Sequence, residues 1–137
     1  MTERPALVFD LDGTLIDSSE GVVAAFNYSL AAMGQPEQPA EMIKKYIGYP
    51  LSDVYPRFTS APLSELYHHF QIKARETVVS STVALGGVTA ALRHLHRDGW
   101  LMAIATTKIR AHVDGIIDKL GWSGYFAALV GGDEVEH

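Results

Sequence analysis

Two acidic residues at the end of an apolar run are the first feature of the chain that could do chemistry. The run Ala6–Phe9 leads directly into Asp10 and Asp12, and Gly13 and Thr14 follow. This pattern is typical of a buried strand that surfaces into a tight turn. Residues two apart on an extended chain point to the same side, and like charges so close favour a small hard cation such as Mg²⁺. An ordinary strand that ends in an acidic turn is the alternative.

The string from Asp10 to Leu15 resembles the first motif of the haloacid dehalogenase superfamily, Asp-x-Asp-Gly-Thr-Leu. The resemblance implies that Asp10 is a nucleophile that forms an aspartyl-phosphate, and that Asp12 is the general acid and then the general base. It also implies that both acids hold Mg²⁺ and that Gly13 and Thr14 bind the substrate. Members that dehalogenate carry an aromatic residue in the place of Asp12, so the resemblance favours phosphoryl transfer. The roles are chemically reasonable, because a carboxylate attacks phosphorus without a base to activate it.

A second candidate group follows a later apolar segment. Trp100–Ala105 predicts a buried strand, and Thr106, Thr107 and Lys108 come directly after it. Thr106 resembles the second motif of the family, a hydroxyl that holds phosphoryl oxygens together with N–H groups at the start of the next helix. Thr107 and Lys108 are further candidates for substrate binding. Two interpretations of Lys108 stay open, a supporting role behind the site and plain surface exposure, because related phosphatases often carry this Lys without using it in catalysis.

The elements that must position these residues alternate along the chain. Hydrophobic periodicity predicts strand, helix, strand, helix and strand, which indicates a Rossmann-like, doubly wound parallel α/β core. A long helical stretch interrupts this order after the first strand and predicts an inserted helical cap. We therefore expect residues 1–17 to form the first strand and catalytic loop of the core, residues 18–80 the cap, and residues 81–137 the second part of the core.

Within the superfamily, the chain looks most like phosphoglycolate phosphatases and related small-molecule phosphatases. The resemblance rests on Phe26-Asn27, on Ile47-Gly48-Tyr49-Pro50-Leu51 and on Gly86-Gly87-Val88. It implies a cap that closes over a bound phosphoester, with Gly48 as a substrate-binding candidate and Lys44, Lys45 and Arg57 as weaker ones. Sugar phosphate mutases of the superfamily carry a His where this chain has Val22, which disfavours a mutase.

The end of the chain leaves the resemblance incomplete. Gly131–His137 resembles the loop before the third motif, and the family's third-motif Lys and fourth-motif acids lie beyond that loop. We therefore expect a chain truncated before these two motifs, with an incomplete core. Asp133 and Glu134 are interpreted as a solvated loop rather than as metal ligands. An incomplete sheet would uncover an apolar edge, so we expect self-association through it.

Composition narrows the class of protein. The chain has 137 residues, of which 47% are hydrophobic and 20% charged, and this balance is typical of a globular protein. The formal charge of −5 argues against a nucleic-acid partner. No apolar run approaches the roughly 20 residues of a membrane span, and the first residues lack a signal peptide's apolar core. We expect a cytoplasmic protein whose partner is a small phosphorylated metabolite, with neither nucleic acid nor membrane as a partner.

The expected activity is Mg²⁺-dependent hydrolysis of a small phosphate monoester such as 2-phosphoglycolate. A pyrophosphatase, a sugar-phosphate phosphatase and a catalytically incomplete fragment are alternatives within the same superfamily. A receiver-type phosphoacceptor domain is the alternative from another class of protein. A receiver needs an acceptor Asp at the end of a later apolar strand, whereas Asp53 lies among helical signals.

Overall fold

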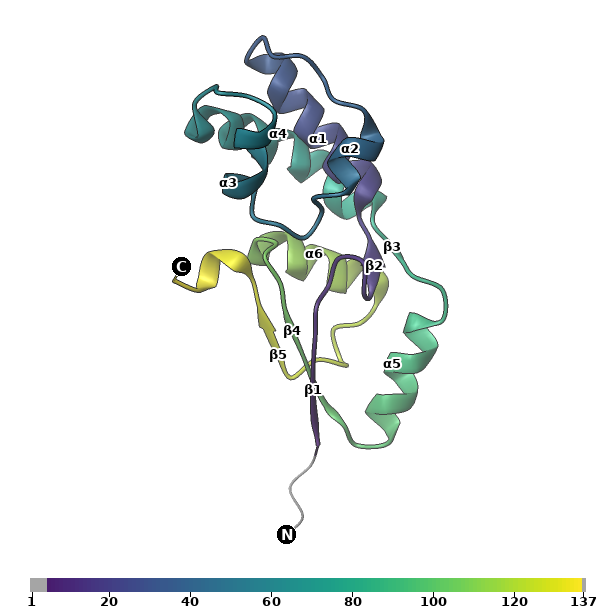
Figure 1. The fold of residues 1–137 in the computed structure, drawn as a ribbon. Coiled ribbons are helices and arrows are strands. Elements are labelled where there is room, and N and C mark those ends of the chain that lie inside the picture. The colour runs from purple at the N-terminus through teal and green to yellow at the C-terminus, as the bar shows by residue number, and fades with distance from the viewer. Residues whose placement is uncertain (1–4, 137) are drawn as a thin grey trace. The chain divides into compact units, whose positions relative to one another are not determined.

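The computed structural model describes residues 5–136 and divides the chain into two compact units (Figure 1). The α/β unit comprises Met1–Asp17 and Val83–His137, and the helical unit comprises Ser18–Thr82. The sequence placed the second boundary after residue 80, where a run of Ser and Thr suggested a joint. The last helix of the helical unit instead continues to Ser81, and Ser80, Ser81 and Thr82 each donate a side-chain hydrogen bond to a carbonyl one turn earlier.

The α/β unit is built on a parallel sheet with the strand order β1-β4-β5. In register, Val8 of β1 lies beside Ala103 of β4, which lies beside Ala128 of β5. Helices connect successive strands, so the predicted parallel α/β architecture is confirmed. The elements are β1 (Ala6–Phe9), α5 (Val88–Arg97), β4 (Leu101–Ala105), α6 (Arg110–Leu120), β5 (Ala128–Val130) and the short 3₁₀ helix η2 (Gly132–Glu134).

One face of this sheet carries the core of the unit. Met102 and Ile104 of β4 are buried on that face, between half-buried residues of β1 and β5. Trp122, just after α6, is fully buried, and its indole N–H donates to Thr89 Oγ1 of α5 over 3.1 Å. Both connecting helices therefore pack on the same face. This follows from topology, because two right-handed crossovers that advance in the same direction place their helices on one side of the sheet.

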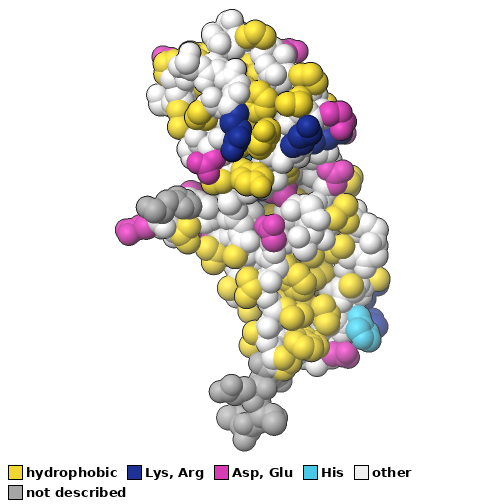
Figure 2. Space-filling view, viewed as in Figure 1, with side chains coloured by type: hydrophobic (Ala, Val, Ile, Leu, Met, Phe, Trp, Pro, Cys, Tyr) yellow, Lys and Arg dark blue, Asp and Glu magenta, His cyan; other side chains and the backbone are white. Residues whose placement is uncertain are grey.

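The other face of the sheet is apolar and largely exposed. Val8 is 69% exposed, Leu101 46% and Val130 37%, and hydrophobic side chains are visible over the strands in Figure 2. Within residues 5–136, β1 has a neighbouring strand on one side only. The sequence predicted such an uncovered apolar edge. The residues of this bare face are Ala6, Val8, Leu101, Ala103, Ala105, Ala128 and Val130.

A short antiparallel ribbon pairs the two segments through which the chain leaves the α/β unit and returns to it. Its strands are β2 (Ile16–Asp17) and β3 (Val83–Ala84), with Ile16 opposite Ala84. Ile16 is fully buried, and Leu85 N–H donates to the Leu15 carbonyl over 3.0 Å. The sequence did not predict this ribbon, because strands of two residues carry no periodicity.

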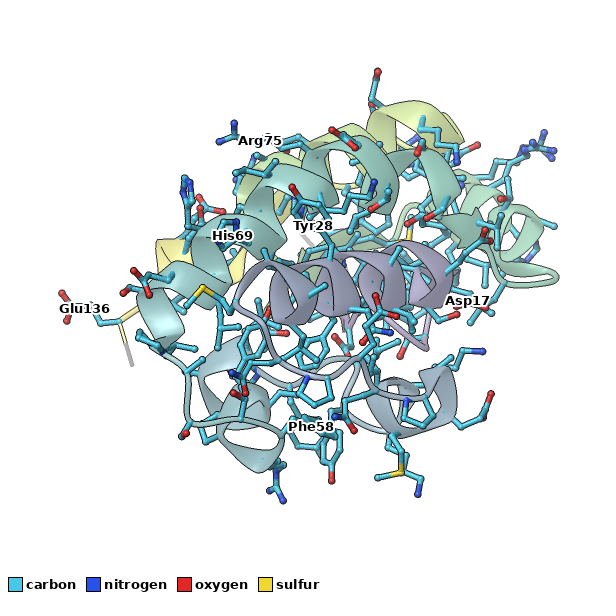
Figure 3. The ribbon with its side chains drawn as sticks, turned by 90° about the horizontal axis from the view of Figure 1, so that it is seen from above. Asp17, Tyr28, Phe58, His69, Arg75 and Glu136 are labelled. Atoms are coloured by element: carbon cyan, nitrogen blue, oxygen red, sulfur yellow. The ribbon has the colours of Figure 1, made fainter. Side chains whose placement is uncertain are left out.

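The helical unit is built on two long helices that lie side by side (Figure 3). A Cβ at Gly21 of the first would lie 2.6 Å from the Thr77 carbonyl of the second, so only glycine allows this approach. Between the two, the Lys73 ammonium lies 5.5 Å from the centroid of the Tyr28 ring. The elements are α1 (Ser19–Ala32), α2 (Ala40–Lys44), α3 (Leu51–Val54), the 3₁₀ helix η1 (Tyr55–Arg57) and α4 (Leu63–Ser81).

Aromatic side chains fill the other side of α1. Phe26 stacks on Tyr55 with 4.5 Å between the ring centroids, and Phe58 packs edge-on against Phe26 at 5.6 Å. The buried hydroxyls of Ser29 and Tyr55 lie 2.6 Å apart and share a hydrogen bond. The short helices after α2 are therefore tied to α1 mainly through aromatic packing.

Alkaline pH is expected to destabilise the helical unit through Tyr55. Burial raises the pKa of Tyr55 from 10.0 to about 12, although its bond with Ser29 lowers it slightly. Folding therefore favours the neutral phenol. Its contribution to the free energy of unfolding is fully present below pH 10.0, the pKa in the unfolded chain, and is lost as the pH rises through about 12. Replacing Tyr55 with Phe should lower the free energy of unfolding by about 1 kcal/mol at neutral pH and flatten its decline at alkaline pH. Urea unfolding of wild type and Tyr55→Phe at neutral and at alkaline pH, monitored by circular dichroism, measures both effects. A variant whose stability declines at alkaline pH as steeply as that of wild type would contradict the prediction.

None of the helices within residues 5–136 combines the length and hydrophobicity that a membrane span requires.

Candidate functional site

Asp10 and Asp12 lie in a tight turn at the carboxyl end of β1. Leu11 and Leu15 are buried and anchor this turn, and Leu15 N–H donates to the Leu11 carbonyl over 2.9 Å. Gly13 has a φ of 79°, the left-handed conformation that favours glycine, as its place in the sequence predicted. The Asp10 carboxylate accepts a bond from the Leu11 N–H over 2.8 Å and is exposed. Asp10 can therefore meet a ligand from solvent.

Asp12 is paired with a buried cation. Lys108 Nζ lies 3.5 Å from Asp12 Oδ2, and the side chains are 9% and 5% exposed respectively. Of the two interpretations left open for Lys108, the structure favours a role in the site over surface exposure. The two residues come from the ends of neighbouring strands, β1 and β4, where parallel pairing brings carboxyl ends together. The pair places one positive charge beside Asp12.

Thr106 lies on the same edge of the sheet, directly after β4. Its N–H donates to the Val130 carbonyl over 3.1 Å, and its hydroxyl oxygen accepts a bond from the Lys108 N–H, also over 3.1 Å. This local bond orients the hydroxyl, whose own hydrogen can be donated to an anion. The following helix starts only at Arg110, so the amides nearest Thr106 are those of the loop, where Thr107 is exposed, rather than those of a helix N-terminus.

The turn after β5 closes against this loop. Gly132 N–H donates to the Lys108 carbonyl over 2.8 Å, and a Cβ on Gly132 would overlap the Thr107 carbonyl. A Cβ on Gly131 would lie 2.5 Å from the Arg110 nitrogen. The two glycines are therefore needed for a close approach of two backbones.

Asp133 and Glu134 were interpreted from the sequence as a solvated loop. Both are exposed, but each is hydrogen-bonded to Arg110. Asp133 Oδ1 accepts a bond from the Arg110 backbone N–H over 2.8 Å. The Glu134 carboxylate accepts bonds from the Arg110 guanidinium over 3.1 and 3.2 Å. The pKa of Glu134 is lowered, first by the bond from the Gly131 N–H and then by Arg110. The pKa of Arg110 is raised by its bonds to Asp114 and Glu134.

Arg110 is a residue that the sequence analysis missed. Asp114 lies one helical turn further on, and this spacing alone could have signalled an ion pair within the helix. The bonds to β5 and to the turn after it span 19 to 24 positions of sequence, and no local pattern predicts them.

The predicted residues of the cap lie in the helical unit. Gly48 is exposed and has a φ of 99°. Lys44 pairs with Glu41 over 3.6 Å, and the Arg57 guanidinium lies 5.1 Å from the centroid of the Tyr46 ring. A role of Gly48 in substrate binding stays a prediction.

The donor set of the site suits a hard cation. Asp10 and Asp12 offer carboxylate oxygens, and Mg²⁺ is commonly held by one or two carboxylates together with water and substrate phosphate. Among residues 5–136, no three acidic, His or Cys side chains gather as a metal-binding group. The residues present therefore fit Mg²⁺ as a partly hydrated ion shared with a phosphate group.

Comparisons with known proteins identify the family of the chain. A family model described as haloacid dehalogenase-like hydrolase matches residues 7–137. The chain is 34% identical over 137 residues to a phosphoglycolate phosphatase of Cereibacter sphaeroides, and the alignment covers 94% of this chain and 63% of the relative. It is 30% identical over 141 residues to the probable phosphatase IndB of Dickeya dadantii, and this alignment covers 98% of this chain and 61% of the relative.

A solved structure of a haloacid dehalogenase-like family hydrolase from Streptococcus pneumoniae superimposes with a TM-score of 0.86 at 27% identity. That match covers 96% of this chain and 62% of the solved one. The chain thus spans 61% to 63% of the length of the curated relatives described above.

Proposed function

Because the chain belongs to the haloacid dehalogenase-like hydrolase family, we propose that it carries the nucleophile and the general acid–base of a phosphatase that hydrolyses small phosphate monoesters. The observation that carries the proposal is the cluster at the carboxyl ends of β1 and β4. There an exposed Asp10 stands next to Asp12, which is paired with Lys108 over 3.5 Å, and Thr106 follows the neighbouring strand. Few ligands other than a phosphate group call for a nucleophilic carboxylate, a buried cation and a hydroxyl donor together.

The proposed reaction has two steps. Asp10 attacks phosphorus, the bond from phosphorus to the ester oxygen breaks, and Asp12, which must enter this step as the protonated acid, donates its proton to the departing alkoxide. Asp10 then carries an acyl phosphate. Asp12, now a carboxylate, accepts a proton from a water molecule that attacks this phosphorus, and inorganic phosphate and free Asp10 result.

The remaining groups bind and orient the phosphoryl oxygens. The Lys108 ammonium supplies positive charge next to Asp12, and Thr106 donates a hydrogen bond from its hydroxyl. Gly13 and Thr14 belong to the turn that follows the nucleophile, and their backbone N–H groups donate to the Ile16 and Leu11 carbonyls over 2.9 and 3.3 Å. We propose that the exposed Thr14 hydroxyl and the open surface at Gly13 contact the substrate instead. Thr107, exposed in the next loop, is a further candidate contact.

Mg²⁺ is the proposed cofactor, and Asp10 and Asp12 are the residues that would hold it. When bound, it supplies positive charge that screens the phosphate from the carboxylate that approaches it. The helical unit is proposed as a cap that shields the reaction from bulk water, with Gly48 near the leaving group.

Phosphoglycolate is the first substrate to test, because a relative that is 34% identical is named phosphoglycolate phosphatase. The experiment is Mg²⁺-dependent phosphate release from a panel that contains 2-phosphoglycolate, a sugar phosphate and pyrophosphate. Release from 2-phosphoglycolate in preference to the other two is the expected outcome. A preference for pyrophosphate would replace the substrate class, and release that does not depend on Mg²⁺ would contradict the cofactor.

We also propose that a second copy of the chain covers the bare face and open edge of β1. The strand can pair with its own copy about a two-fold axis, and the bare face holds no charge whose burial would oppose contact. Concentration-dependent dimers are therefore expected in sedimentation velocity.

Replacing Val8, which is 69% exposed, with Lys should abolish this dimer, because the charge would be buried at the contact. The matched control is Val135→Lys, which places the same charge at an exposed position outside the sheet. Wild-type chain that sediments as a monomer at every concentration would contradict the proposal.

A further inference from the structure

Arg110 links the start of α6 to β5 and to the turn that follows it. Its Nη1 donates to the Leu129 carbonyl over 2.7 Å and to both carboxylate oxygens of Glu134 over 3.1 and 3.2 Å. Its backbone N–H donates to Asp133 Oδ1 over 2.8 Å, and its Nε donates to Asp114 over 2.8 Å. Three of its four partners thus lie in β5 or the turn after β5, and the fourth lies on its own helix.

The turn that Arg110 holds is the turn on which the Thr106–Lys108 loop rests. Gly132 N–H donates to the Lys108 carbonyl over 2.8 Å, and Gly131 and Gly132 approach the loop backbone more closely than any side chain would allow. A shift of residues 131–134 must therefore move the Lys108 backbone or break its bond with Gly132.

We propose that Arg110 is a positioning residue, which fixes where the Thr106 hydroxyl and the Lys108 ammonium stand relative to Asp10 and Asp12. This inference rests on the proposed function, and Arg110 itself touches no reacting atom. A guanidinium suits the task, because its planar donors, Nη1 toward Leu129 and Glu134 and Nε toward Asp114, set an orientation as well as a distance.

Arg110 is expected to affect the placement of the Thr106–Lys108 loop much more than the free energy of unfolding. The ion pairs of Arg110 are solvent-exposed, and exposed pairs contribute little to the free energy of unfolding. The loop that they hold, however, must place a hydroxyl and an ammonium on one phosphate group, and small misplacement of such groups is costly to binding and catalysis. Loss of Arg110 should consequently weaken anion binding far more than it lowers the melting temperature.

The test compares Arg110→Gln with Asp114→Asn, a matched control that removes the ion pair along α6 and leaves the bonds to the turn intact. Amide hydrogen exchange at Lys108 and Gly132 is measured on the full chain, together with its melting temperature. Binding of inorganic phosphate in the presence of Mg²⁺ is measured by calorimetry. For Arg110→Gln we expect exchange at both amides to accelerate about tenfold or more and phosphate affinity to fall about tenfold, with little change in melting temperature.

Asp114→Asn should leave exchange and affinity unchanged, and Arg110→Lys should fall between wild type and Arg110→Gln because it keeps the charge but loses the fork. If Arg110→Gln does not fold, the comparison of Arg110→Lys with Asp114→Asn decides the question. Unchanged exchange in the Arg110 variants, or equal effects from Asp114→Asn, would overturn the proposal. If the wild-type chain binds no phosphate, the proposed function fails, whereas the exchange data still decide whether Arg110 holds the loop.

Discussion

Replacing Asp10 with asparagine is expected to remove Mg²⁺-dependent phosphate release, by about a thousandfold or more. The amide keeps the size of the side chain and can still accept the bond from the Leu11 N–H, so the turn after β1 should persist. It cannot form an acyl phosphate and provides a poorer ligand for Mg²⁺, so both proposed roles of Asp10 are lost in one substitution.

The matched control is Asp118→Asn, which removes an exposed carboxylate from α6, away from the strand ends. This variant should release phosphate at the wild-type rate. Both variants should keep the wild-type circular dichroism spectrum. Phosphate release that survives in Asp10→Asn would assign the nucleophile to another group.

Replacing Lys108 with methionine is expected to lower the free energy of unfolding of the α/β unit by about 3 kcal/mol in the absence of Mg²⁺. The substitution leaves Asp12, which is 5% exposed, without its cation and beside a second carboxylate. Removing one member of a buried pair exposes the desolvation cost of the other. Added Mg²⁺ should restore part of the loss, because the ion supplies positive charge to the same carboxylates.

Denaturant unfolding with and without Mg²⁺ measures both effects. Lys119→Met is the control for loss of a positive charge, because Lys119 is exposed in the last turn of α6. It should change stability by less than about 1 kcal/mol, whether or not Mg²⁺ is present. A Lys108→Met variant as stable as wild type would show that the pair with Asp12 contributes nothing.

Most of the features that could be predicted depend on residues that are close together in sequence. Asp10 and Asp12 follow an apolar run and precede Gly13, so their place at a strand end is visible from neighbouring residues alone. The long helices α1 and α4 were predicted for the same reason, because their apolar residues recur with helical spacing.

Contacts between distant segments could not be predicted. The pair of Asp12 with Lys108 exists because parallel pairing of β1 and β4 brings two strand ends together, and nothing near Lys108 in sequence distinguishes a buried lysine from an exposed one. The bonds of Arg110 to the turn after β5 depend in the same way on the approach of Gly131 and Gly132. Tertiary structure alone creates both arrangements.

The boundary of the helical unit illustrates a different limit. Ser80, Ser81 and Thr82 resemble a joint, since such residues favour turns. In the structure the helix continues to Ser81, and the three hydroxyls bond to carbonyls one turn back. Composition does not show which acceptor each hydroxyl finds, so it does not predict the last residue of this helix.

Detection of a phosphoryl group on Asp10 tests the central claim most directly. The Asp12→Asn variant is mixed with 4-nitrophenyl phosphate and excess Mg²⁺, because this leaving group needs no proton and the variant lacks the base that activates water. The excess of Mg²⁺ offsets the poorer ligand that the amide provides. Acid quenching and borohydride reduction then convert an acyl phosphate to homoserine, which peptide mass spectrometry locates. The account predicts the modification at position 10 and none in the absence of Mg²⁺. Nitrophenol release with no modification at Asp10, or with modification at another residue, would contradict it.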